Sequence, residues 1–102
     1  MDEPLALEWA AYRAACDAVD ALRGNPVFSD PRAGPERLRR ATERLLIGRR
    51  SAVAASERLI GRAEREPDID PDWLDELRDE HDLLVRAAAR SERQLARSAI
   101  LA

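Results

Sequence analysis

The sequence predicts an all-α fold: three helices, with a short N-terminal helix followed by a long antiparallel helical hairpin, assembled as a helical-bundle dimer. Glycine and proline gather in residues 24–35, and two prolines bracket residues 67–71, so the chain is interrupted twice. Between these breaks Ala, Leu, Glu and Arg dominate and aromatic residues make up only 4% of the chain, a composition typical of long helices. With 102 residues, we expect a single helical domain over 1–102.

The first helix is expected over residues 4–23, capped by Asp2 or Glu3 and stopped by Gly24 and the residues that follow it. Its apolar residues recur at steps of three and four, which indicates one buried stripe. These residues are Leu5, Trp9, Tyr12, Cys16 and Val19. The linker over 24–35 is kept from helical structure by its prolines. It contains Val27 and Phe28, which we expect to pack against the bundle and to be candidate contacts for a protein partner.

The second helix is expected over residues 36–66, about 45 Å long, and the third over 71–101, with the hinge at 67–70. Asp70 is the expected N-cap of the third helix, and Pro71 its first residue. Both helices carry small and apolar residues at heptad spacing, so folding the chain at the hinge brings the two series together. The expected register places Leu59 between Leu77 and His81, Ala52 between Leu84 and Ala88, and Leu45 between Ser91 and Leu95.

A second apolar row on the middle helix makes its apolar face wider than one partner helix can cover. The first helix is too short to cover the whole hairpin, and uncovered apolar rows usually meet another copy of the chain. We therefore expect a homodimer or higher homo-oligomer. The expected self-association residues are Trp9, Tyr12, Leu46, Val53 and Ile60.

The middle helix is the basic part of the chain. Residues 1–35 carry three Arg against six acidic residues, residues 36–66 nine against five, and residues 67–102 five against nine. This pattern favours ion pairs between neighbouring helices over attraction to an outside polyanion. The alternative is a regulator that binds nucleic acid through arginines of this helix. The arginines of that alternative are Arg37, Arg40, Arg44 and Arg50.

The hinge is acidic, and its spacing resembles the start of a calcium loop. Asp68, Asp70 and Asp72 match the first ligand positions of an EF-hand, but the required glycine is replaced by Trp73 and a helix begins at once. We therefore expect helix capping here, with no metal, and treat the three aspartates as a candidate contact for a basic partner.

Catalytic motifs have little support in this sequence. His81 is the only histidine, which excludes sites that need two imidazoles, and Cys16 lies on the apolar stripe. We expect both to be packing residues and expect no cofactor. An enzyme with a site between subunits, around His81 and arginines, remains an alternative.

The sequence favours a non-enzymatic interaction or assembly module, such as an adaptor or small regulator, that acts through coiled-coil-like surfaces. The single cysteine indicates a reducing compartment, and the acidic start is unlike a secretion signal. No apolar run approaches the ~20 residues of a membrane span. We therefore expect a cytoplasmic protein with protein partners and no membrane association.

Overall fold

The computed structural model describes residues 3–101, with side chains over 5–98. Three α-helices make up most of this part of the chain: α1 (Glu3–Arg23), α2 (Pro35–Ala63) and α3 (Pro71–Leu101). A short 3-10 helix, η1 (Pro26–Ser29), lies in the linker, and the described residues form no strand. The all-α fold with three helices is therefore confirmed.

The linker and the end of α2 differ most from the expected organisation, and α1 and α2 each begin one residue earlier than expected. The linker contains one 3-10 turn, because Pro26 suits the first position of a helix and the side chain of Asn25 accepts a hydrogen bond of 3.0 Å from the Val27 N–H. Helix α2 ends at Ala63, three residues before the expected end. Pro67 disfavours helical geometry at Glu66, and the last turn tightens through a hydrogen bond from Glu66 N–H to the Ala63 carbonyl.

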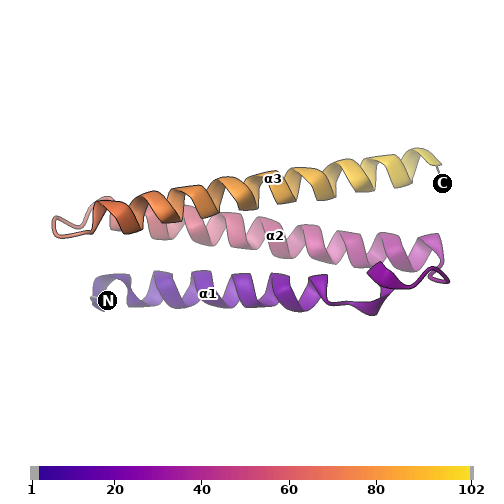
Figure 1. The fold of residues 1–102 in the computed structure, drawn as a ribbon, viewed down its shortest axis with the longest axis horizontal. Helices are drawn as coiled ribbons and strands as arrows, with labels where there is room; N and C mark the ends of the chain where they lie inside the picture. Colours follow the sequence, from indigo (N-terminus) through magenta and orange to yellow (C-terminus); the bar gives the residue numbers. More distant parts are fainter. Residues whose placement is uncertain (1–2, 102) are drawn as a thin grey trace.

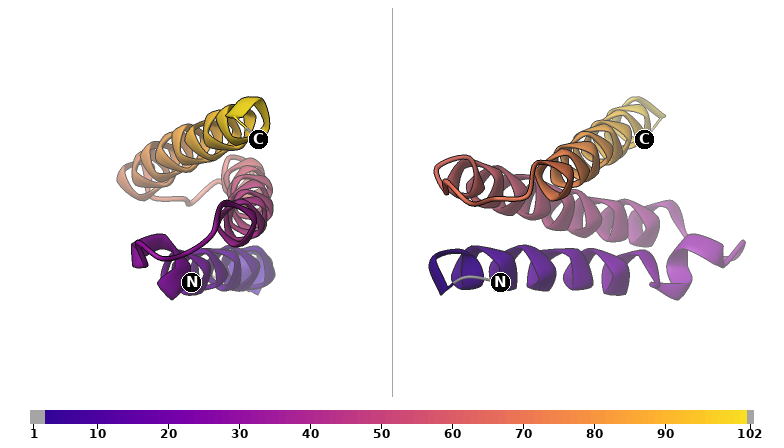
Figure 2. Two further views of the ribbon diagram at one scale, coloured as in Figure 1. Left: turned by 90° about the vertical axis from the view of Figure 1, so that its right-hand side faces the viewer. Right: turned by 60° about the vertical axis from the view of Figure 1, so that its left-hand side comes forward.

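Helix α2 lies between the other two helices, and both run antiparallel to it (Figure 1). The start of α1 therefore lies at the same end of the molecule as the α2–α3 turn, and this end is called the turn end below. The axis of α3 diverges from the other two helices as it approaches the opposite end (Figure 2). The result is an elongated molecule of 52 × 21 × 17 Å.

The core consists of three clusters that follow α2 from the turn end to the opposite end. Helices α1 and α2 supply buried residues to all three, whereas α3 supplies buried residues only to the first two. Its partly buried Leu84 borders the third. The clusters contain Leu5, Ala63 and Leu74; Tyr12, Ala55, Leu59 and Leu77; and Val19, Leu45 and Ala52.

The hairpin register agrees with the expected one near the turn end. Leu59 packs in one cluster with Leu77, and Leu84 packs against the cluster that contains Ala52. Leu45 instead packs in the cluster formed with α1 and bordered by the linker residue Phe28. The divergence of α3 accounts for this change, because α1 and the linker cover α2 where α3 has moved away.

A candidate groove between α1 and α3

A groove of about 470 Å³ separates α1 from α3, with α2 as its floor. The lining residues of α1 lie between Trp9 and Arg23 and those of α3 between Glu80 and Arg90, in each case at steps of one helical turn. Arg49 is the residue of α2 that lines it. The groove exists because α1 and α3 both pack on α2 and approach each other closely only near the turn end.

At the turn end, aromatic and polar contacts join α1 to α3. The Tyr12 hydroxyl donates a hydrogen bond to the Glu80 carboxylate, and the ring centroids of Trp9 and Trp73 lie 5.9 Å apart. Burial raises the pKa of Tyr12, and the hydrogen bond to Glu80 raises it further. Burial also raises the pKa of the neighbouring Cys16 thiol. Both groups are therefore protonated at neutral pH.

At the opposite end of the groove, three arginines lie together: Arg23, Arg49 and Arg90. The partly buried guanidinium of Arg49 donates hydrogen bonds of 3.1 Å to the Ala87 carbonyl and 2.6 Å to the Ser91 hydroxyl. Burial lowers the pKa of Arg49, and the nearby Arg90 and Arg23 lower it further. This electrostatic environment favours binding of a negative group.

The arginine end has few counter-charges of its own. Over residues 5–98, no carboxylate lies within ion-pair distance of Arg49 or Arg90, and the contact of Arg23 with Asp20 is a long 3.9 Å. The Nε atom of Arg49 is buried without a hydrogen-bond acceptor. A buried polar group without a partner is costly, so an incoming carboxylate would satisfy an existing deficit.

Arg49 is the functional candidate that sequence reasoning missed. Its charge alone predicts a solvent-exposed position on the middle helix, whereas its side chain crosses from α2 to α3 where the hairpin seam is lined by small residues. The preceding residue, Gly48, packs so closely on α1 that a Cβ there would lie 2.7 Å from Leu22 Cδ1. The sequence contains a clue to this position. Gly48, Ala52 and Ser91 are small, so the seam between the two helices has space for the long side chain of Arg49.

The apolar residue that the groove leaves most exposed is Leu83 on α3. Its side chain lines the groove and is 60% exposed. Ile47 on α2 is similarly exposed at 63% but does not line this groove. The two residues therefore form a matched pair for testing whether the groove binds a partner.

The five residues expected in self-association lie in different surroundings. Trp9 and Tyr12 line the groove, but Tyr12 is buried within the single chain, as is Leu46. Val53 lies in a separate shallow hollow between α2 and α3, and Ile60 is partly covered by the core near the turn end. Tyr12 and Leu46 therefore have little surface left for a second copy.

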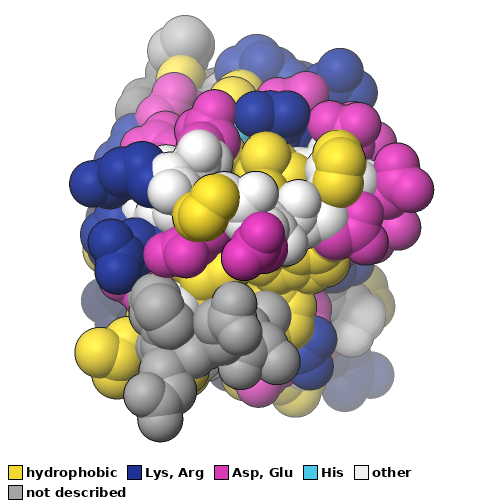
Figure 3. Space-filling view, turned by 90° about the vertical axis from the view of Figure 1, so that its left-hand side faces the viewer, with side chains coloured by type: hydrophobic (Ala, Val, Ile, Leu, Met, Phe, Trp, Pro, Cys, Tyr) yellow, Lys and Arg dark blue, Asp and Glu magenta, His cyan; other side chains and the backbone are white. Residues whose placement is uncertain are grey.

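The three hinge aspartates are exposed at the turn end, where Figure 3 shows acidic side chains gathered around the turn. Asp70 Oδ1 accepts a hydrogen bond of 3.0 Å from the Asp72 N–H, which is the capping contact expected at the start of α3. Within the described residues, no group of three or more Asp, Glu, His or Cys side chains is arranged to hold a metal ion. The linker residues Val27 and Phe28 are partly buried.

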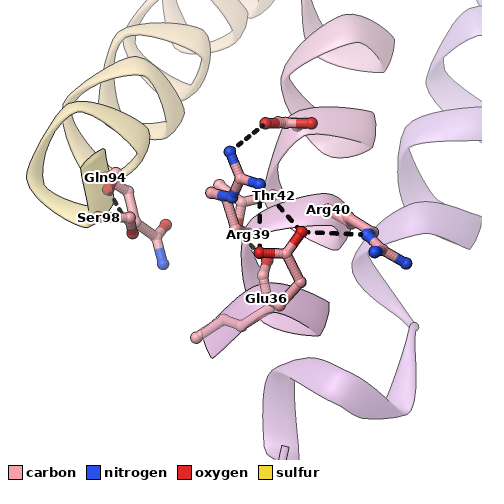
Figure 4. Close-up of polar contacts among 8 residues, drawn as sticks. Glu36, Arg39, Arg40, Thr42, Gln94 and Ser98 are labelled. Atoms are coloured by element: carbon pink, nitrogen blue, oxygen red, sulfur yellow. Dashed lines mark hydrogen bonds and ion pairs between the residues drawn. The ribbon is translucent and has the colours of Figure 1, made fainter. Parts of the chain in front are cut away.

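The arginine row of α2 is divided by the fold. Arg37, Arg40 and Arg44 line one shallow hollow beside the linker. Figure 4 shows Glu36 between Arg39 and Arg40, with both arginines paired to it. Arg50 faces α3 instead and forms an ion pair with Glu92. Three of the four arginines named for nucleic-acid binding therefore share a surface, and the fourth does not.

His81 is partly buried against α2. Its Nδ1 lies 2.7 Å from the hydroxyl oxygen of the buried Ser56, which also donates a hydrogen bond of 2.7 Å to the Val53 carbonyl. The imidazole is therefore held between the two helices of the hairpin, outside the groove lining.

Over the described residues, no helix has both the length and the apolar character needed to cross a membrane. The chain matches no protein-family model, no curated protein and no solved structure.

Proposed function

We propose that the protein is a non-enzymatic helical assembly module that binds a second copy of itself through the groove between α1 and α3. The observation that carries this proposal is the groove itself. Helices α1 and α3 both pack on α2 but leave a gap between them, so the bundle is one helix short of the four-helix arrangement. A helix seated in the groove would cover Leu83 and supply carboxylates to Arg49.

The charges support a second copy as the occupant. The arginine end of the groove needs an acidic helix, and the first half of α3, with exposed acidic residues such as Asp75, Glu76 and Asp79, is such a helix. Each copy therefore carries both the basic groove and an acidic segment that suits it.

The protonation states favour a binding surface over a catalytic site. Nucleophilic catalysis by Cys16 or acid–base catalysis by Tyr12 would require a pKa shifted toward neutrality, but burial raises both pKa values. His81, the only histidine of the chain, lies outside the groove lining.

Solution mass tests the proposal directly. We expect light scattering after gel filtration to give twice the mass of one chain at micromolar concentration. Leu83→Glu should give a monomer, because a charge would replace the apolar residue at the centre of the interface. Ile47→Glu, an equally exposed position outside the groove, should leave the mass unchanged. A monomeric wild type, or equal behaviour of the two variants, would contradict the proposal.

A second candidate is nucleic-acid binding, supported by the three arginines that share the hollow beside the linker. Its signature would be binding to a labelled duplex that weakens steeply with salt and is lost in Arg37→Glu. Glu36 and Glu43 form ion pairs within this part of α2 and reduce its positive potential, so we rank this function second.

A further inference from the structure

The outward face of α3 carries an ordered charge pattern. Six residues on one side of the helix, spaced three or four apart except for the adjacent Asp79 and Glu80, form this pattern, and five of them are charged. In chain order they are Glu76, Asp79, Glu80, Leu83, Arg86 and Arg90. All six side chains are exposed, and the sign of the charge changes from negative to positive at Leu83.

These five charged side chains form few polar contacts within the chain. Of the five charged residues, Glu80 accepts a hydrogen bond from Tyr12, and none forms an ion pair with another residue of the described part of the chain. By contrast, Arg78, which lies away from this face, pairs with both Glu64 and Asp75. The face is therefore available for charges from another molecule.

The pattern is self-complementary in one orientation only. Glu76 and Arg90 each lie seven residues from Leu83, and Glu80 and Arg86 each lie three residues from it. Two copies of α3 side by side in the same direction would place like charges together. In the antiparallel orientation, a two-fold axis at Leu83 places Glu76 beside Arg90 and Glu80 beside Arg86 of the second copy.

We infer that the dimer forms by antiparallel contact of α3 with α3 of the second copy, with the two Leu83 side chains meeting at the two-fold axis. This inference rests on the proposed function and specifies its interface. Leu83 and Arg90 also line the groove, so Glu76 of the second copy reaches the arginine end. There it meets Arg90, beside the partly buried Arg49 that has no carboxylate of its own.

Charge reversal tests this register. Glu76→Arg and Arg90→Glu each place two pairs of like charges in a homodimer, and each should raise the dimer dissociation constant at least about tenfold. The double variant E76R/R90E restores opposite charges and should recover dimerisation. Mixing the two single variants should give a heterodimer, because both of its pairs are again opposite in sign.

Sedimentation equilibrium of the full chain, with native mass spectrometry of the mixture, measures these outcomes. Glu57→Arg and Arg58→Glu are matched controls, since both residues are exposed on α2 outside the groove lining, and neither change should alter the dissociation constant. Recovery in the double variant and in the mixture also shows that the single variants remain folded.

The possible failures are distinguishable. A dimer that is indifferent to both reversals, or a double variant no stronger than the singles, would overturn the antiparallel register and leave the proposed assembly function standing. A wild-type chain that is monomeric would overturn the proposed function itself.

Discussion

Gly48 and Gly61 both lie inside α2, but their surroundings differ. A Cβ at Gly61 would meet no atom within 4 Å, whereas one at Gly48 would lie 2.7 Å from Leu22 Cδ1. Gly61→Ala should therefore raise the free energy of unfolding by about 0.5–1 kcal/mol through helix propensity. Gly48→Ala should gain less, because Leu22 must move. Urea unfolding of both variants measures the difference, and equal gains would show that the approach of α1 is looser than described.

The raised pKa of Tyr12 should make the protein less stable at alkaline pH. Its pKa is raised in the folded state by burial and by Glu80, so the unfolded chain releases this proton first, near pH 10. Stability should then fall as the pH rises above about 10. The neighbouring Cys16, whose pKa is also raised, adds a loss of the same sign that begins at lower pH.

The variant Tyr12→Phe separates the two contributions. It keeps the ring and removes the titrating hydroxyl, so its free energy of unfolding should decline less steeply than that of the wild type above about pH 10. Urea unfolding across this pH range measures both slopes. Parallel slopes would show that the buried hydroxyl does not control alkaline stability.

At the scale of elements, the cap of α3 gives a defined prediction. The side chain of Asp70 accepts the hydrogen bond from the Asp72 N–H, so Asp70→Ala should lower the free energy of unfolding by about 1 kcal/mol. Asp70→Asn should keep most of the stability, because an amide oxygen also caps. Asp68→Ala, in the same exposed turn, is the control. An equal loss at Asp68 would indicate that general charge effects dominate over capping.

The helices could be predicted because proline and glycine mark their ends. Pro71 with Asp70 defines the start of α3, and Pro67 limits the end of α2, so local chemistry determines where the helices lie. The short 3-10 helix after Asn25 was not expected, since proline was treated only as a helix breaker. Its position at the start of a turn gives it the opposite effect.

The groove could not be predicted in the same way. Heptad spacing placed Leu45 beside Leu95, but the crossing angle of two helices depends on all their contacts, and α3 diverges before this level. For the same reason, the sequence could not distinguish Tyr12, which is buried, from Trp9, which is partly exposed. Arg49 was missed because charge alone suggested an exposed position.

At the scale of the whole molecule, the distribution of charge along a helix affects its contacts with another molecule more than the net charge of the helix does. Residues 67–102 are acidic as a segment, yet eight of the nine acidic residues precede Leu83 and four of the five arginines follow it. A net charge of −3 for the chain conceals this separation. The electrostatic energy of contact between two such helices therefore depends on whether they run parallel or antiparallel. The net charge of a segment does not describe this dependence.

The central place of α2 has a consequence for how the chain reaches its native state. The two extensive helix–helix interfaces join neighbours in the sequence, α1 with α2 and α2 with α3, whereas the contacts of α1 with α3 are confined to the turn end. The main interfaces therefore form without bringing distant segments together first. Chains with such local topology close short loops at low entropic cost and fold rapidly. Either hairpin can form before the other, and the helix they share then serves as the template for the remaining one.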